Sequence, residues 1–282
     1  KLIKIKMKNL KSHGFNTKNK TYIIAEIGIN HNGDIDLAKK LIESAARAGV
    51  DAVKFQTYLT EKRAPKDSPI FDILKKCELP FESFLELKLH SEKFNVEFFS
   101  TPFDSESVDF LESIGVNIYK IASFDIVNTN LLKKIAKTKK PIILSVGMSN
   151  LNEINNAYKI IKSYNENLAL LHCVSSYPTD EKDSNISVIS NLKESFDCIV
   201  GQSDHTNDIQ VPLYSVCCGA QILEKHFMID DNMSCVDSPV SITENQMKKL
   251  VKETRRIEKI MGSSELKTRD CEKGSLIFRR SS

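Results

Sequence analysis

Apolar runs of strand length alternate with amphipathic stretches of helix length along most of this chain. Runs such as YIIAEIG, VEFFSTPF and PIILSVGM are almost continuously apolar, which is typical of strands buried on both faces of a parallel sheet. The stretch Ile35–Ala48 instead repeats its apolar residues at helical spacing. This helix is expected to begin after Asp34, a good N-cap residue, and to end before Gly49.

Eight strand patterns alternate with eight helical patterns, which predicts an α/β fold. The expected architecture is a closed (β/α)8 TIM barrel with eight parallel strands, rather than an open doubly wound sheet. A chain of 282 residues suits one such barrel. We assign residues 1–21 to an N-terminal arm, 22–262 to the barrel and 263–282 to a linker. The insertion Leu59–Pro80 is interpreted as a rim or lid segment. Further helices are expected at Phe81–Phe94, Ser105–Ile114, Asn130–Lys137, Leu151–Tyr164, Ile186–Phe196 and Thr243–Met261.

The composition, with 41% hydrophobic and 27% charged residues, is that of a soluble globular protein. A net charge of +3 without a basic stripe interleaved with aromatics gives no indication of a nucleic-acid partner. The seven cysteines include no CxxC pair, which fits a reducing cytoplasm. No stretch is long and apolar enough for a signal peptide or a membrane span. We therefore expect a cytoplasmic protein with no membrane partner.

Two histidines stand near the ends of neighbouring strand patterns, 21 residues apart. Because the parallel strands of a barrel end at one edge, His205 and His226 can meet there. A single histidine at a strand end is more often a structural residue. The pair, with Asp204 and Glu224 beside it to orient the imidazoles, favours a divalent metal site for Mn²⁺, Zn²⁺ or a similar ion. Glu224 and His226 should share one face of their strand, whereas Lys225 points to the other.

Two lysines also point from strand patterns toward the barrel interior. Lys54 shares a face with Gln56, and Lys120 lies two strands later; lysine is seldom buried without a partner, so an anionic ligand is expected. His31 is interpreted as a loop cap or a ligand contact, and His172 as a core residue. Polar residues at the strand ends are Glu26, Lys54, Gln56, Thr101, Lys120, Ser123, Ser145, Ser175, Tyr177, Ser203, His205, Glu224 and His226. This set permits aldol cleavage, addition to an enol phosphate, or a Schiff base at Lys120.

The chain resembles the bacterial sialic acid synthase family, whose members condense phosphoenolpyruvate with an N-acylated amino sugar. The motifs that carry the resemblance are IIAEIGINHNGD, VKFQT, STPFD, YKIASF, PIILSVGM, LLHCVSSYPT, GQSDHT and ILEKHF, in family order over nearly the entire chain. The resemblance implies a TIM barrel, a homodimer and a C-terminal antifreeze-like (SAF) domain. The chain ends at SLIFRRSS, where that domain would begin, so the domain is expected to be absent here.

The resemblance also assigns roles to residues. His205 and His226 would hold the divalent metal, usually Mn²⁺, with Mg²⁺ or Co²⁺ as alternatives. Lys54 and Lys120 would neutralise the phosphate and carboxylate groups, and Glu26 would transfer a proton. Phosphoenolpyruvate contacts are implied for Lys54, Thr101, Lys120, Ser123, Ser145 and Ser203, and contacts with the sugar or its reacting end for Glu26, Gln56, Tyr177 and Asp237. Ser175 and Glu224 complete the expected substrate-binding set.

Three departures from the N-acetylneuraminate-forming branch leave the acceptor sugar open. Ser175 replaces a common asparagine, Phe55 a frequent histidine, and Cys235, Val236 and Asp237 stand where Gly-Pro-Asp is frequent. The acceptor is therefore N-acetylmannosamine or a related hexose, or else the diacetamido-trideoxyhexose that yields pseudaminic or legionaminic acid. The motif IASFDI is closer to the pseudaminic branch. The remaining alternatives are another phosphoenolpyruvate-using synthase, an aldolase, and a catalytically silent barrel that binds an anionic sugar.

Overall fold

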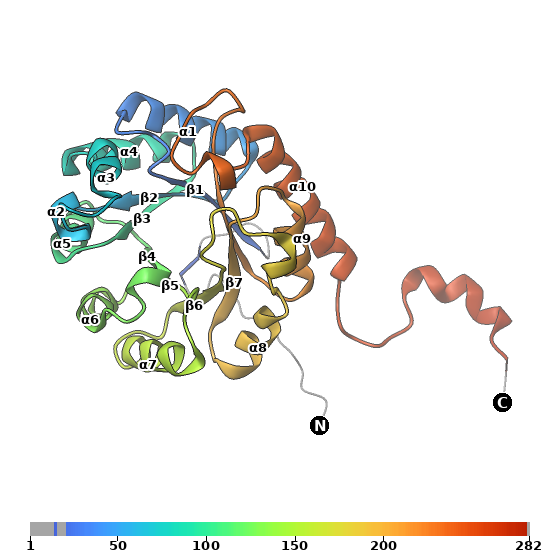
Figure 1. The fold of residues 1–282 in the computed structure, drawn as a ribbon. Coiled ribbons are helices and arrows are strands. Elements are labelled where there is room, and N and C mark those ends of the chain that lie inside the picture. Colours follow the sequence, from blue (N-terminus) through green and yellow to red (C-terminus); the bar gives the residue numbers. More distant parts are fainter. Residues whose placement is uncertain (1–13, 16–20, 281–282) are drawn as a thin grey trace.

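The strands of the computed structural model form a closed parallel barrel (Figure 1). The structure describes residues 14–15 and 21–280, so most of the expected N-terminal arm, 1–21, lies outside the described residues. Every strand pairs with its neighbour in the sequence, and the last pairs with the first. The strands are β1 (Tyr22–Gly28), β2 (Ala52–Thr57), β3 (Glu97–Pro102), β4 (Tyr119–Ile121), β5 (Ile142–Ser145), β6 (Leu168–His172), β7 (Ile199–Asp204) and β8 (Ile222–His226). The predicted TIM barrel is confirmed.

Helices surround the barrel and return the chain to its amino-terminal end after each strand (Figure 1). The helices are α1 (Ile35–Ala48), α2 (Thr60–Arg63), α3 (Phe71–Cys77), α4 (Phe81–Lys93), α5 (Ser105–Ser113), α6 (Thr129–Lys137), α7 (Leu151–Lys162), α8 (Val188–Ser195), α9 (Gln210–Cys217) and α10 (Glu244–Met261). The predicted helix ends agree within two residues. Asp34 caps α1 by accepting hydrogen bonds from the amides of Asp36 and Leu37, and Gly49 ends it with φ of 85°.

The alternation of side chains along each strand divides the core into two layers. One set of strand residues packs outward against the helices, and this layer includes Ile23, Val53 and Leu144. The other set points into the barrel, where Phe15, Tyr22, Ile24, Phe99, Ile143, Leu171 and Ile222 form an apolar cluster. Because this cluster fills the interior toward the amino ends of the strands, polar chemistry is confined to their carboxyl ends.

Charged pairs join the first and last elements of the barrel. Helix α10 packs against α1, and Arg47 Nη2 on α1 lies 2.7 Å from Glu244 Oε2 on α10. At the opposite end of α10, Arg255 Nη2 lies 3.2 Å from Asp51 Oδ2, which precedes β2. These contacts stabilise the closure between β8 and β1.

The insertion between β2 and α4 has structure of its own. It contains α2 and α3, which enclose a small apolar cluster of Ile29, Tyr58, Ala64, Leu74 and Cys77. The segment therefore forms part of the rim of the barrel. Among the described residues, no helix combines the length and the apolar character needed to cross a membrane.

Candidate active site

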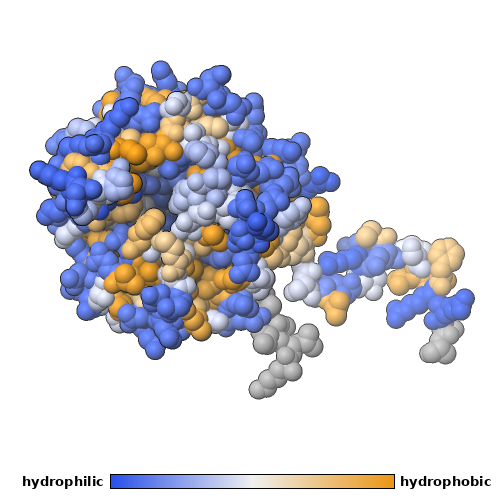
Figure 2. Space-filling model, viewed as in Figure 1, coloured by the Kyte–Doolittle hydropathy of each residue, from blue (hydrophilic) through white to orange (hydrophobic). Residues whose placement is uncertain are grey.

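A cavity of about 220 Å³ opens at the carboxyl end of the barrel strands, where Figure 2 shows a hollow in the surface. All of the site residues expected from the sequence line this cavity. They are Glu26, Lys54, Gln56, Thr101, Lys120, Ser123, Ser145, Ser175, Tyr177, Ser203, His205, Glu224, His226 and Asp237. The cavity is also lined by Ile29, Arg63, Phe103, Ala122, Phe124 and Cys173, which the sequence did not point to.

Strand register explains why residues far apart in the sequence meet here. Glu26 on β1 is paired with Lys54 on β2 and with His226 on β8, and Ser203 on β7 is paired with Glu224 on β8. Because these positions alternate with outward-facing residues along each strand, the polar side chains all enter the cavity. Lys225 points the other way, as predicted.

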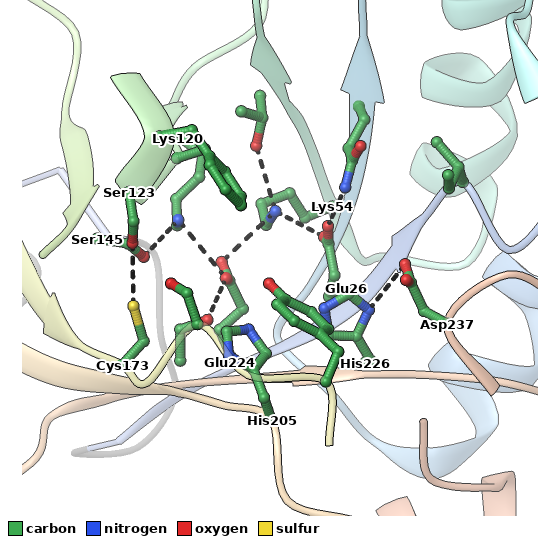
Figure 3. Close-up of a pocket in the computed structure, with 18 of the residues that line it drawn as sticks. Glu26, Lys54, Lys120, Ser123, Ser145, Cys173, His205, Glu224, His226 and Asp237 are labelled. Carbon is green, nitrogen blue, oxygen red and sulfur yellow. Dashed lines mark hydrogen bonds and ion pairs between the residues drawn. The ribbon is translucent and has the colours of Figure 1, made fainter. Parts of the chain in front are cut away.

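Two lysines and two glutamates form a buried charge cluster in the cavity (Figure 3). Lys54 Nζ lies 2.7 Å from Glu26 Oε2 and 3.7 Å from Glu224 Oε2. Lys120 Nζ lies 3.6 Å from Glu224 Oε1. All four side chains are at most 5% exposed. The cluster balances its own charge, which is the condition for burying four ionisable groups together.

Hydroxyl groups complete the hydrogen bonding of this cluster. Lys54 donates to Thr101 Oγ1 at 3.2 Å and Lys120 donates to Ser145 Oγ at 2.6 Å. The hydroxyl of Ser203 donates to Glu224 Oε1 at 2.8 Å. Ser123 accepts a hydrogen bond from the Gly147 amide at 3.0 Å. Ammonium groups flanked by hydroxyls provide both charge and directional donors for a phosphate or a carboxylate.

The two carboxyl groups of the cluster differ in their affinity for protons. Burial raises the pKa of Glu26, because desolvation outweighs the attraction of Lys54. Burial also opposes the ionisation of Glu224, but Lys120 and Lys54 outweigh it and lower the pKa of Glu224 to about 2. Burial lowers the pKa of Lys120. Glu26 is therefore the carboxyl group in the cluster that most readily takes up a proton.

His205 and His226 lie side by side on one wall of the cavity, with ring centroids 5.5 Å apart. His205 Nδ1 is 2.6 Å from the carbonyl oxygen of Val174, which can only accept, so Nδ1 carries the proton and Nε2 keeps its lone pair. Burial lowers the pKa of His205 to about 3, so its ring is neutral. The ring of Tyr177 stacks on His205 at 4.2 Å and meets His226 edge-on at 5.8 Å.

Asp237, on the loop after β8, lies beside the second imidazole and also lines the cavity. Its Oδ2 atom is 3.4 Å from His226 Nδ1. Burial opposes the charge on His226, but Asp237 outweighs it and raises the pKa of the ring. The Asp237 loop is held by Asn30, whose Oδ1 accepts from the Asp237 amide at 3.0 Å and whose Nδ2 donates to the Phe227 carbonyl at 3.0 Å.

The expectation that Asp204 and Glu224 orient the two imidazoles is wrong. Asp204 lies 2.6 Å from Lys225 Nζ and accepts from Thr206 Oγ1 at 2.7 Å, on the face of β7 opposite the cavity. Glu224 enters the cavity but contacts the lysines instead. The Val174 carbonyl and Asp237 occupy the places expected for these carboxylates.

The other two histidines singled out in the sequence do not line the cavity. The Gly33 amide donates to His31 Nδ1 at 3.1 Å, so His31 caps its loop. His172 Nε2 lies 2.8 Å from the Ser184 carbonyl and is buried, as expected for a core residue.

The two imidazoles of His205 and His226 suit a divalent cation that keeps open coordination positions. In the described part of the chain, no group of three or more His, Cys, Asp or Glu side chains could hold a metal. Two imidazoles do line the cavity, however, and each has a partner at its Nδ1 atom, the Val174 carbonyl for His205 and Asp237 for His226, which leaves the Nε2 atoms for a ligand. The protein would thus supply two nitrogen ligands and leave the other positions to water and substrate oxygens, as catalytic metal sites do.

Arg63 is the residue of the cavity that sequence reasoning missed most clearly. It ends α2, and its Nη1 donates to Gln56 Oε1 at 2.9 Å. The insertion has no strand periodicity, so nothing in its pattern directs this side chain to the cavity. Cys173 was also missed, although it directly follows β6; its Sγ lies 3.1 Å from Ser123 Oγ.

Comparison with known proteins relates this chain to a family. A model of the NeuB family matches residues 41–266. An uncharacterised protein of Methanocaldococcus jannaschii is 46% identical over 246 residues, which cover 87% of this chain and 73% of that protein. The N,N'-diacetyllegionaminic acid synthase of Campylobacter jejuni is 44% identical over 260 residues, covering 86% and 78% of the two chains. A solved structure, the N-acetylneuraminic acid (sialic acid) synthetase of Leptospira borgpetersenii in complex with citrate, superposes with a TM-score of 0.90 and 41% identity, covering 93% of this chain and 92% of that one.

Proposed function

This chain belongs to the NeuB family of sialic and related nonulosonic acid synthases, and on that premise we propose that it joins phosphoenolpyruvate to the aldehyde carbon of an N-acylated amino sugar and releases phosphate. One observation carries the proposal. A buried cluster of two lysines and two glutamates shares a single cavity with two adjacent imidazoles. That combination supports binding of a small polyanion beside a carbonyl group that must be activated.

Phosphoenolpyruvate is assigned to the side of the cavity that holds the lysines. Lys54 and Lys120 would neutralise its phosphate and carboxylate groups, and Thr101 and Ser145, which already accept from these lysines, would turn toward the ligand. Ser123, Ser175 and Ser203 line the same cavity and belong to the proposed binding set.

His205 and His226 are proposed to hold a divalent cation, with Mn²⁺ as the first choice and Mg²⁺ or Co²⁺ as alternatives. When bound, such a cation supplies Lewis acidity toward the aldehyde oxygen of the sugar. Asp237 orients His226 from a distance of 3.4 Å, and the Val174 carbonyl fixes the tautomer of His205.

The reaction requires one carbon–carbon bond to form and one carbon–oxygen bond to break. C3 of phosphoenolpyruvate attacks the aldehyde carbon, and the aldehyde oxygen takes up a proton. Water then adds at C2, and the tetrahedral intermediate loses phosphate by cleavage of the C2–O bond. Glu26, whose pKa burial raises, is the proposed group for proton transfer. Lys54 and Lys120 offset the charge of the departing phosphate.

The acceptor we propose first is a diacetamido-trideoxyhexose, with a legionaminic-type product. The Campylobacter jejuni enzyme named for that product is 44% identical to this chain. N-Acetylmannosamine is the second candidate, because the Leptospira borgpetersenii sialic acid synthetase is 41% identical and has nearly the same fold. A homodimer, expected from the resemblance, belongs to the same proposal, as does the interpretation of 263–282 as a linker toward an antifreeze-like domain.

Phosphate release tests the proposal. The protein is incubated with phosphoenolpyruvate and Mn²⁺, alone and with each acceptor in turn. We expect release only when an N-acylated amino sugar is present, and faster release with the diacetamido sugar. Release with simple aldehydes alone would favour another phosphoenolpyruvate-using synthase, and a protein that binds phosphoenolpyruvate but releases no phosphate with any acceptor would favour a silent barrel.

A further inference from the structure

The insertion after β2 places an arginine at the edge of the cavity. Arg63 lines the cavity and is half-buried, and its guanidinium lies 3.8 Å from the ring centroid of Phe103 and 4.6 Å from that of Tyr58. Its Nη1 donates to Gln56 Oε1 at 2.9 Å. Two aromatic rings and one amide therefore fix the plane of the guanidinium group.

The segment that carries Arg63 is itself anchored. The Tyr58 hydroxyl donates to the Leu74 carbonyl at 2.9 Å, and the Thr60 amide donates to Glu78 Oε2 at 2.9 Å. Ala64, the next residue in the chain, is buried in the apolar cluster of the insertion. Arg63 is thus held in position before any ligand arrives, which lowers the entropic cost of binding through it.

Most donors of this arginine remain free for a ligand. A guanidinium group has five N–H donors, and in the described part of the chain only the bond to Gln56 uses one of them. Across the same described ranges, no carboxylate lies within the 4.0 Å that defines an ion pair with Arg63. The remaining N–H groups make no hydrogen bond to the described protein atoms and can donate to a ligand in the cavity.

The position of Arg63 in the cavity favours a ligand group of the sugar. Burial lowers the pKa of the guanidinium; Tyr58 acts most strongly against that change, followed by the carboxylates of Asp125, Asp237 and Glu26. Arg63 donates to Gln56, a residue assigned to the sugar, so the ligand group that meets Arg63 is expected to belong to the sugar and not to phosphoenolpyruvate. A carbonyl oxygen, which can only accept, matches a group that can only donate.

We propose that Arg63 binds the carbonyl oxygen of an acylamino group on the acceptor sugar, and so selects acylated amino sugars over their hydroxyl counterparts. This inference rests on the proposed function and adds to it a residue for acceptor specificity. Arg63 also orients Gln56, whose Nε2 points to Glu26 Oε1 at 3.4 Å. Recognition of the acyl group is thereby linked to the residue proposed for proton transfer.

Binding of unreactive sugar alcohols tests the role of Arg63 without requiring turnover. The reduced forms of an acylated sugar and of its hydroxyl counterpart are titrated by calorimetry into protein that holds phosphoenolpyruvate and Mn²⁺. One pair differs at C2, N-acetylmannosaminitol against mannitol, and a second pair differs in the acetamido group at C4. We expect the wild type to prefer the acylated member of at least one pair by about 10- to 100-fold, the range of a charge-assisted hydrogen bond.

Substitutions at Arg63 and at the neighbouring Lys62 distinguish a loss of sugar binding from a general effect on folding. Arg63→Met keeps the length of the side chain and removes its donors, and it should reduce the preference to within about 3-fold while the affinity for phosphoenolpyruvate and the melting temperature stay unchanged. Arg63→Lys should show a preference between those of Arg63→Met and the wild type, because an ammonium group cannot reproduce the planar set of guanidinium donors. Lys62→Met is the matched control: Lys62 is 52% exposed and pairs with Glu106, so the preference should be that of the wild type.

The inference would be overturned by a wild type with no preference for either acylated member, or by an Arg63→Met variant that keeps the full preference. A lower affinity for phosphoenolpyruvate in Arg63→Met would likewise contradict it, because the arginine would then serve the other substrate. Absence of phosphate release by a wild type that shows the preference would count against the proposed function and leave the binding role of Arg63 supported.

Discussion

The carboxylate of Glu26 lies 2.7 Å from the ammonium group of Lys54, and both side chains are almost completely buried. This ion pair joins β1 to β2 at the point where the cavity begins. Lys54 also lies 3.7 Å from Glu224, so it retains an acidic partner if Glu26 takes up a proton. Glu26 can therefore change its protonation state without leaving Lys54 as an isolated buried charge, which is costly.

Glu26→Gln should slow the reaction without preventing substrate binding. The amide preserves the shape and can still accept a hydrogen bond from Lys54, but it cannot carry a proton between substrate atoms. We expect kcat to fall about 100-fold or more, with the KM for phosphoenolpyruvate changed by less than about 3-fold. Steady-state phosphate release measures both constants. A variant with kcat close to that of the wild type would remove Glu26 from the proposed proton transfer.

Lys120→Met should weaken phosphoenolpyruvate binding. The variant loses a buried donor that reaches Ser145 at 2.6 Å and the charge that lies 3.6 Å from Glu224. We expect the affinity for phosphoenolpyruvate to fall about 10- to 100-fold, with acceptor affinity nearly unchanged, because a charge-assisted hydrogen bond is lost.

Calorimetric titration of phosphoenolpyruvate into wild type and variant checks the Lys120 prediction. Borohydride treatment of the wild type in the presence of substrates provides a second check, since the burial that lowers the pKa of Lys120 also favours a Schiff base. A trapped adduct on Lys120 would contradict the condensation mechanism and support an aldolase.

Replacement of His226 by alanine should remove the metal and the activity together. His226 and His205 line the cavity, and among the described residues no group of three or more His, Cys, Asp or Glu side chains could hold a metal, so loss of either ring removes one of the two proposed nitrogen ligands. We expect bound Mn²⁺, measured by atomic absorption after dialysis, to fall below about one tenth of the wild-type content, with an unchanged circular dichroism spectrum. His172→Ala is the comparison at a histidine outside the cavity, and its metal content should be that of the wild type. Full activity in His226→Ala would contradict the metal assignment.

Glu244 should contribute to stability in a defined range of pH. The hydrogen bond from Arg47 lowers the pKa of Glu244 to about 2; burial acts against this, and Lys248 and Ser44 act with Arg47. A carboxyl group whose pKa is lower in the folded state stabilises the protein above its unfolded pKa, near 4.5, and loses that contribution as the pH falls to about 2.

Glu244→Gln should therefore destabilise the barrel by about 2 kcal/mol at pH 7, and the difference from the wild type should disappear near pH 2. Urea unfolding of both proteins across this range measures it. Glu265→Gln, on the exposed segment after α10, is the control and should change stability by less than about 0.5 kcal/mol. A difference at pH 7 that persists unchanged at pH 2 would show that packing, and not charge, explains the effect of Glu244.

The barrel and the strand-end residues could be predicted from the sequence because both follow from short periodic patterns. A strand alternates its faces, so Lys54 with Gln56 and Glu224 with His226 could be assigned to the interior directly. The same rule places Asp204 on the face opposite Ser203. The expectation that Asp204 orients an imidazole ignored that alternation and was wrong.

Residues on loops could not be predicted in this way. Arg63 reaches the cavity because the insertion folds over its own apolar cluster, which no periodic pattern reports. Asp237 was identified only through the resemblance to the family, since its position depends on a hydrogen bond from its amide to Asn30, 207 residues away. Long-range contacts of this kind are set by tertiary structure and leave no local signal.

The most direct test of the proposed condensation follows the bridging oxygen of phosphoenolpyruvate. The substrate is labelled with ¹⁸O between C2 and phosphorus, the protein is supplied with Mn²⁺ and the acceptor sugar, and the released phosphate is examined by mass spectrometry. Cleavage of the C2–O bond predicts that the label appears in phosphate, and that the C2 oxygen of the nonulosonic acid comes from water. Label retained at C2 of the product would show cleavage of the P–O bond and would contradict the mechanism assigned to Lys54, Lys120 and Glu26.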